Sequence, residues 1–151
     1  MFMMIEHEMT AGAAKTFMTA GNATFTLESV STGVRYTYKV KAAKPNPDYP
    51  GTEPMYFVSV LTGPDNTSDY TYIGKVQREK FSLTKASKMG PESGPVKAFA
   101  WTLAKLAAGE SVEGKVKVYH LNHCGRCGRE LTVPSSVEAG IGPECANKMA
   151  A

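Results

Sequence analysis

Residues 34–41 alternate strictly between apolar and polar positions. Two valines and two tyrosines occupy one face of this segment, and threonine and three basic residues occupy the other. A period of two is typical of a β-strand with one buried face. Residues 23–30 alternate in the same way around Phe25 and Leu27, and a Ser-Thr-Gly turn at 31–33 separates the two segments. The pattern predicts a β-hairpin with one aromatic and aliphatic face and one basic face.

Three further strands are predicted beyond a loop at 44–54, which contains four prolines and suits neither a helix nor a central strand. Residues 55–62 form a nearly continuous apolar run, and we expect a well-buried strand there. Residues 70–77 form the next strand, and 81–84 form a short one. Because short turns join most of these segments, we expect an antiparallel meander.

One amphipathic helix is predicted at 96–108. Its apolar residues recur at i, i+3, i+7, i+10 and i+11, which places them on a single helical face. Pro95 suits the first turn, and Gly109 ends the helix. The single tryptophan, Trp101, lies off the centre of the apolar stripe, so we expect it to pack at the edge of the core. A second, shorter helix is predicted at 10–20.

All three cysteines lie near the C-terminal end of the chain. A strand predicted at 115–119 leads to His120, and the spacing from this histidine is H-x3-C-x2-C-x17-C through Cys124, Cys127 and Cys145. Zinc binds four such ligands in a tetrahedron, and an odd number of cysteines argues against a closed disulfide framework. We therefore predict one structural zinc ion held by these four residues.

For the fourth zinc ligand the candidates are His120 and His123, with Glu144 or a water molecule as remote options. We prefer His120, because His123 is adjacent to Cys124 and neighbouring residues rarely point at the same ion. The alternatives to zinc are reduced cysteines without a metal and a redox-active C-x2-C pair. We expect Gly125 and Gly128 to take the positive φ that a knuckle turn requires.

Cys145 has the sequence context of a ligand at the start of a helix. Pro143 suits the first helical position, and the positive end of a helix stabilises a thiolate. A cysteine knuckle followed by a ligand at a helix N-terminus is the arrangement of a treble clef. We therefore expect a treble-clef-like zinc knuckle here.

The predicted fold class is α+β, an antiparallel β-meander with one packed amphipathic helix and the C-terminal zinc knuckle. We divide the 151 residues into an N-terminal segment with a short helix at 1–22, a β-rich α+β domain at 23–119 and a zinc-binding motif at 120–151. No apolar run is long enough to span a membrane, and no basic segment precedes the short apolar N-terminus. We therefore expect a cytoplasmic protein.

The run from Cys124 to Cys145 resembles a zinc-knuckle signature of uncharacterised phage and bacterial proteins. The shared pattern is C-x2-C-G-R-x-L-T-x-P-x-S followed by G-x-G-P-x-C. Residues 57–74 also resemble small phage-type proteins that carry this knuckle after a β-rich domain. The resemblance implies a zinc ion and a small phage accessory-type protein, and it implies no defined activity.

Basic residues are concentrated in the middle of the chain. The formal net charge is +3, but residues 70–105 alone carry seven bases and two acids. Lysine and arginine neutralise phosphates, and exposed aromatic rings stack on unpaired bases, so the pattern predicts nucleic-acid binding. The candidate contact residues are Lys39, Lys41, Lys75, Arg78, Lys80, Lys85, Lys88, Arg126 and Arg129. The interleaved aromatic residues, which also fit a core, are Tyr36, Tyr38, Tyr70, Tyr72 and Phe81.

The alternative function is a protein-binding module, such as an inhibitor of a host enzyme or of a host defence complex. Polar loops at 44–54, 63–69 and 86–95 could present its contact surface. Asp65 and Asp69 form an acidic turn, which the local hydrogen bonding of aspartate explains without catalysis. The sequence contains no recognisable nucleophile–base pair or phosphate-binding loop, so we do not expect an enzyme.

Overall fold

Seven strands and two helices make up the part of the chain that the computed structural model describes, which is residues 7–43, 54–63, 69–110, 112, 114–120, 123–126 and 140–141. Neighbouring strands are antiparallel and form one sheet in the order β1-β7-β2-β3-β4-β5-β6. The strands are β1 (His7–Met9), β2 (Asn22–Ser29), β3 (Arg35–Ala42), β4 (Met55–Leu61), β5 (Tyr70–Gln77), β6 (Lys80–Ser82) and β7 (Val116–His120). The helices are α1 (Ala11–Met18) and α2 (Gly94–Ala107).

Strands β2 to β6 follow one another across the sheet, which confirms the predicted meander. Strands β2 and β3 form the predicted hairpin, paired from Asn22 opposite Lys41 to Glu28 opposite Arg35. The last strand does not extend the meander beyond β6. Strand β7 instead lies at the other side of the sheet, between β1 and β2. An antiparallel sheet with two helices agrees with the α+β class.

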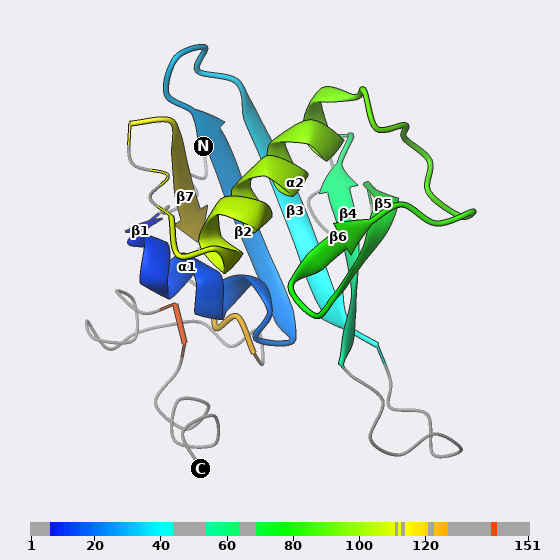
Figure 1. The fold of residues 1–151 in the computed structure, drawn as a ribbon, viewed down its shortest axis with the longest axis horizontal. Helices are drawn as coiled ribbons and strands as arrows, with labels where there is room; N and C mark the ends of the chain where they lie inside the picture. The colour runs from blue at the N-terminus through cyan, green and yellow to red at the C-terminus, as the bar shows by residue number, and fades with distance from the viewer. Residues whose placement is uncertain are drawn as a thin grey trace.

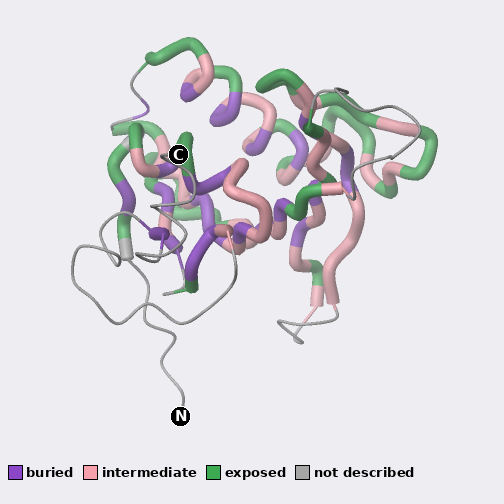
Figure 2. Tube along the Cα trace, turned by 90° about the horizontal axis from the view of Figure 1, so that it is seen from below, coloured by how far each residue is buried: buried purple, intermediate pink, exposed green. Residues whose placement is uncertain are grey.

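Both helices lie on the same side of the sheet, so the sheet has a covered face and an open face, over which the structure describes no other element (Figure 1). Aromatic rings fill the covered face. The Phe25 and Tyr38 rings are stacked with their centroids 5.7 Å apart, and the Phe81 ring meets Phe99 of α2 edge-on at 5.0 Å. Buried segments of α2 and of the strands face each other in Figure 2. The core therefore lies between the helices and this one face of the sheet.

Helix α2 presents the predicted apolar stripe to the core. Its buried residues are Val96, Phe99, Thr102, Leu103 and Leu106. Trp101 is partly buried against the core, which confirms its expected place at the edge.

Tyr38 fastens the start of α2 to the sheet. Its hydroxyl group donates a hydrogen bond of 2.7 Å to the carbonyl oxygen of Pro95. Burial raises the pKa of Tyr38, with a smaller contribution in the same direction from Tyr36. The phenol therefore keeps the proton that it donates.

Helix α1 begins after Thr10, whose hydroxyl oxygen accepts a hydrogen bond of 3.2 Å from the Ala13 N–H. This contact satisfies one of the unpaired amides at the helix start. At the other end of the helix, Phe17 and Met18 are almost fully buried. The short helix predicted at 10–20 is therefore confirmed, and it belongs to the core.

One core cluster includes residues from all three predicted parts of the chain. Met9 of β1, Cys124 and Ile141 pack in the same cluster as the central strands. The division of the chain into three parts at residues 22 and 119 stays a prediction. Residues on both sides of each boundary belong to the same core. Among the described residues, no helix combines the length and the apolar character needed to span a membrane.

Two positions differ from the predicted pattern. Val34 was expected on the apolar face of the hairpin, but it precedes β3 and is 45% exposed. Phe57 belongs to the strand expected to be well buried, yet it is 42% exposed. A continuous apolar run predicts burial on both faces, whereas the described helices cover only the face of β4 that carries Val58 and Val60.

Candidate functional site

An exposed aromatic ring lies between two lysines on the open face of the central strands. Lys41 on β3 pairs with Phe57 on β4, and Phe57 pairs with Lys75 on β5. Neighbouring strands are roughly 4.8 Å apart, so the backbones of the two lysines are separated by roughly 10 Å. We call these three residues the Lys-Phe-Lys row.

Tyr72 supports the ring of Phe57. The two ring centroids are 6.0 Å apart with an interplanar angle of 65°, an edge-to-face contact. The Tyr72 hydroxyl lies 3.2 Å from Oγ1 of Thr84, and the backbone N–H of Lys88 donates to the Tyr72 carbonyl oxygen at 3.0 Å. Tyr72 is therefore held at both its backbone and its hydroxyl, and Lys88 is brought next to it.

A β-bulge in β5 places Tyr72 on the open face. The pairing of β4 with β5 shifts by one residue between Val58 and Ser59, which leaves Ile73 as an extra, fully buried residue. In a regular strand Tyr72 and Lys75 would lie on opposite faces, because side chains alternate. The extra residue places both on the open face.

Lys39 adds a third cationic position to this surface, in the neighbouring row. It pairs with Ser59, which pairs with Tyr72, so this row runs beside the Lys-Phe-Lys row. The Lys39 Nζ lies 4.4 Å from the centroid of the Tyr70 ring, within the range of a cation–π interaction. Burial raises the pKa of Tyr70, so its ring remains neutral beneath the ammonium group.

The two halves of the open face differ in charge. On the β2–β7 half, Glu28 accepts a hydrogen bond of 3.2 Å from the Tyr119 hydroxyl and lies 3.7 Å from Nε of Arg35. Burial, followed by this hydrogen bond, raises the pKa of Tyr119. On the β4–β6 half, no described outward position is acidic, and no described ion pair involves Lys41 or Lys75. The β3–β5 surface therefore keeps its positive charge.

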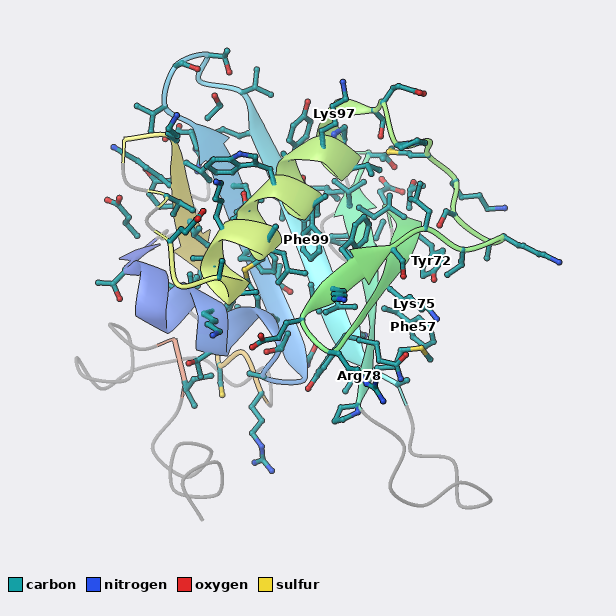
Figure 3. All side chains as sticks on the ribbon, viewed as in Figure 1. Phe57, Tyr72, Lys75, Arg78, Lys97 and Phe99 are labelled. Carbon is teal, nitrogen blue, oxygen red and sulfur yellow. The ribbon has the colours of Figure 1, made fainter. Side chains whose placement is uncertain are left out.

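The structure brings part of the predicted contact set together. Lys39, Lys41 and Lys75 share the open face, and Figure 3 shows Phe57, Tyr72 and Lys75 close together beside β4 and β5. Arg78 lies at the adjoining β5–β6 turn, whereas Lys97 lies far away on α2 (Figure 3).

The other predicted contact residues occupy three places. Lys80 lies on β6 opposite Gln77, and Lys85 and Lys88 are exposed in the segment after β6. Arg126 is half-buried in the knuckle, at a separate place in the fold, and Arg129 lies outside the described residues.

The predicted aromatic set divides between the two faces. Tyr38 is fully buried, and the partly buried Phe81 ring packs edge-on against Phe99, so both rings belong to the covered face. Tyr70 and Tyr72 lie on the open face. Phe57 is absent from the predicted set. It lies on the same face of β4 as Ser59, opposite the face of Val58, and this alternation could have indicated an outward side chain.

The start of the predicted zinc knuckle is well placed for a metal ligand. Cys124 is buried and forms no disulfide. The backbone N–H of Arg126 donates to Sγ of Cys124 at 3.4 Å. Backbone amides support metal-bound thiolates through such contacts. This contact therefore fits Cys124 as a zinc ligand.

Gly125 has a different role from the predicted one. Its φ is not positive. A Cβ atom at Gly125 would instead lie 2.6 Å from Cδ2 of Phe17, and one at Gly140 would lie 2.7 Å from the same atom. The Gly125 N–H donates to the Gly140 carbonyl oxygen at 2.9 Å. The two glycines therefore allow two distant parts of the motif to contact one ring of α1.

The described histidines of the motif lie in different environments. His120 is fully buried, with its ring centroid 5.8 Å from that of Phe17, whereas His123 is exposed. Among the described residues, no group of three histidine, cysteine or acidic side chains could hold a metal. Cys127 and Cys145 lie outside those residues. The zinc site and the choice of His120 over His123 therefore stay predictions, and the chemistry of Cys124 and His120 fits them.

Comparison with known proteins adds one match. Residues 117–150 match a family of unknown function (DUF6011). This region covers most of β7 and the predicted knuckle, and it leaves out the Lys-Phe-Lys row. No curated protein and no solved structure matches the chain. The case for a function therefore rests on the geometry of the open face.

Proposed function

We propose that the protein is an accessory protein that binds nucleic acid through the basic open face of its sheet. The observation that supports this most is the Lys-Phe-Lys row, in which an exposed ring lies between two lysines without ion-pair partners in the described part of the chain. Lysines neutralise phosphates and release counterions, so binding should weaken steeply as salt is added.

The surface around the row strengthens its attraction for an anionic chain. The Lys39 ammonium group lies over the Tyr70 ring, and the backbone of Lys88, whose side chain is exposed, contacts Tyr72. The acid on the β2–β7 half, Glu28, is occupied by its own partners. A patch of one sign of charge steers an oppositely charged ligand and raises its association rate.

In this proposal the zinc ion has a structural role. His120, Cys124, Cys127 and Cys145 would hold it, with three thiolates and one imidazole that leave no open position for a substrate. The ion would fasten the end of the chain to α1 through Phe17, which both Gly125 and Gly140 approach. It would therefore stabilise the scaffold without contacting the nucleic acid.

A salt titration of oligonucleotide binding tests the function. Binding is measured by fluorescence anisotropy with labelled single- and double-stranded oligonucleotides. The logarithm of the association constant should fall linearly with the logarithm of the salt concentration. Lys41→Gln and Lys75→Gln should each reduce the magnitude of that slope by about 0.7–0.9. Lys97→Gln, on α2 and away from the row, should leave the slope unchanged.

If none of the oligonucleotides shows salt-dependent binding, the proposal is wrong. Co-purification of one stoichiometric host protein, together with that absence, would favour the protein-binding module instead. Equal effects of the Lys41 and Lys97 substitutions would place the contact outside the open face.

A further inference from the structure

The binding of phosphates does not explain why the Phe57 ring is exposed. A phosphate-binding surface needs only cations, yet here a large apolar ring is 42% exposed between two of them. A phenylalanine that is 42% exposed forgoes part of the stabilisation of about 1.5–3 kcal/mol that full burial of its side chain provides. The ring has a face available for a flat apolar partner.

The way in which Tyr72 supports the Phe57 ring favours a partner that stacks on this ring. Tyr72 meets Phe57 edge-to-face, and the contacts of Tyr72 with Thr84 and Lys88 hold it in place. A ring that is held in one orientation loses little conformational entropy on binding. In the described part of the chain, no helix or strand covers the Phe57 ring.

The geometry points to single-stranded nucleic acid as the ligand, with one unpaired base stacked on Phe57 and the flanking phosphates at Lys41 and Lys75. This inference rests on the proposed function and narrows it. A base stacks on a side chain only when it is outside a duplex, and stacking on aromatic rings tolerates every base because each has a π-face. A backbone that crosses β3, β4 and β5 would pass one lysine, the ring and the other lysine in turn, over roughly 10 Å.

Duplex DNA fits the same surface less well. Its bases are paired and stacked inside the helix, so a duplex could use the lysines but would leave Phe57 without a partner. The strands β3 to β5 form part of a sheet and present no helix or two-stranded ribbon that enters a major groove. We therefore expect a preference for a single strand over a duplex of the same sequence at matched salt.

Substitutions of Phe57 test the stacking contact. The probes are labelled oligothymidylate and oligouridylate of about 12 nucleotides, a length within the range of known single-strand sites, and a duplex of equal length. Phe57→Leu should weaken binding of the single strands by about 5- to 150-fold, the equivalent of one stacked base. It should change duplex binding little.

Two further variants make the result specific to the ring. Phe57→Tyr keeps an aromatic face and should restore most of the affinity. Val30→Ala removes another exposed apolar side chain, in the β2–β3 turn, and should have no effect.

The outcomes separate this inference from the proposed function. Equal, salt-dependent binding of single strand and duplex, unchanged by Phe57→Leu, would overturn single-strand stacking while the nucleic-acid function stands. A loss in Phe57→Leu that Phe57→Tyr does not restore would also overturn it, because packing would then explain the loss. No binding of any probe would end both.

Discussion

Both faces of the sheet carry phenylalanine and tyrosine, but the rings are buried on one face and more exposed on the other. On the covered face, Phe25, Tyr38 and Phe99 are buried and contact one another, with ring centroids 5.3–6.3 Å apart. On the open face, Phe57 is 42% exposed, and among the described residues its ring contacts that of Tyr72 alone. The first group forms the core, and the second forms a platform between lysines.

The difference shows that neither residue type nor strand decides the role of an aromatic side chain. Phe57 lies next to Val58, which is fully buried, and only the alternation along β4 separates their environments. The stability of the protein should therefore depend on one face, and its binding on the other.

The largest effect is expected from the predicted metal, which would act at the edge of the covered face. Cys127→Ser should lose the zinc ion and destabilise the motif at 120–151, because structural zinc in small motifs contributes an apparent binding free energy of about 10–16 kcal/mol. Elemental analysis and thermal unfolding of wild type and variant measure this. His120→Ala should also lose zinc, whereas His123→Ala should retain it.

Full zinc content and unchanged stability in Cys127→Ser would contradict the zinc assignment. Loss of zinc in His123→Ala, with retention in His120→Ala, would exchange the two histidines.

Truncation of one phenylalanine on each face compares the faces directly. Phe99→Ala should lower the free energy of unfolding by about 3–5 kcal/mol, because it leaves a cavity among buried rings. Phe57→Ala should lower it by less than about 1 kcal/mol, since an exposed ring loses little on truncation. Urea unfolding at fixed salt measures both. Equal losses would mean that Phe57 belongs to a core.

The contact of the knuckle with Phe17 should be sensitive to a single methyl group. Gly125→Ala should destabilise the protein by about 1–3 kcal/mol, because the new Cβ would overlap the Phe17 ring. Gly12→Ala provides the matched control. Apart from its chain neighbours and the helix's own backbone, no atom of the described residues lies within 4 Å of a Cβ at that helical position, so the substitution should stabilise by up to about 1 kcal/mol. Thermal unfolding distinguishes the two, and a neutral Gly125→Ala would exclude a tight contact.

The smallest effect concerns Tyr38, whose hydrogen bond to Pro95 lies on the covered face. Tyr38→Phe should lower the free energy of unfolding by about 1 kcal/mol at neutral pH. Burial raises the pKa of Tyr38, so above about pH 10 the unfolded chain loses a proton that the folded protein keeps. The contribution of the buried phenol to the free energy of unfolding is therefore complete below that pH and is lost as the pH rises above it. Tyr38→Phe should reduce this loss.

Urea unfolding at neutral pH and at about pH 10.5 checks both parts of the Tyr38 prediction. An identical alkaline decline in wild type and Tyr38→Phe would mean that this phenol does not contribute to it.

Local sequence patterns are sufficient to predict the elements whose cause is local. A period of two predicted the β2–β3 hairpin, and a helical stripe closed by Gly109 predicted α2, because residues a few positions apart decide both patterns. The basic face of the hairpin followed from the same alternation, and so Lys39 and Lys41 were found. The cysteine spacing also predicted the chemistry of the knuckle, which lies largely outside the described residues.

Which face of the sheet is open, and which side chains lie together on it, depends on the packing of elements that are distant in sequence. Alternation shows that a strand has two faces, but the place of α1 and α2 decides which one is covered. One extra residue, Ile73, reverses the alternation in β5 and brings Tyr72 to the side of Lys75. The row that joins Lys41, Phe57 and Lys75 depends on pairing between strands that are distant in sequence, which no local pattern encodes.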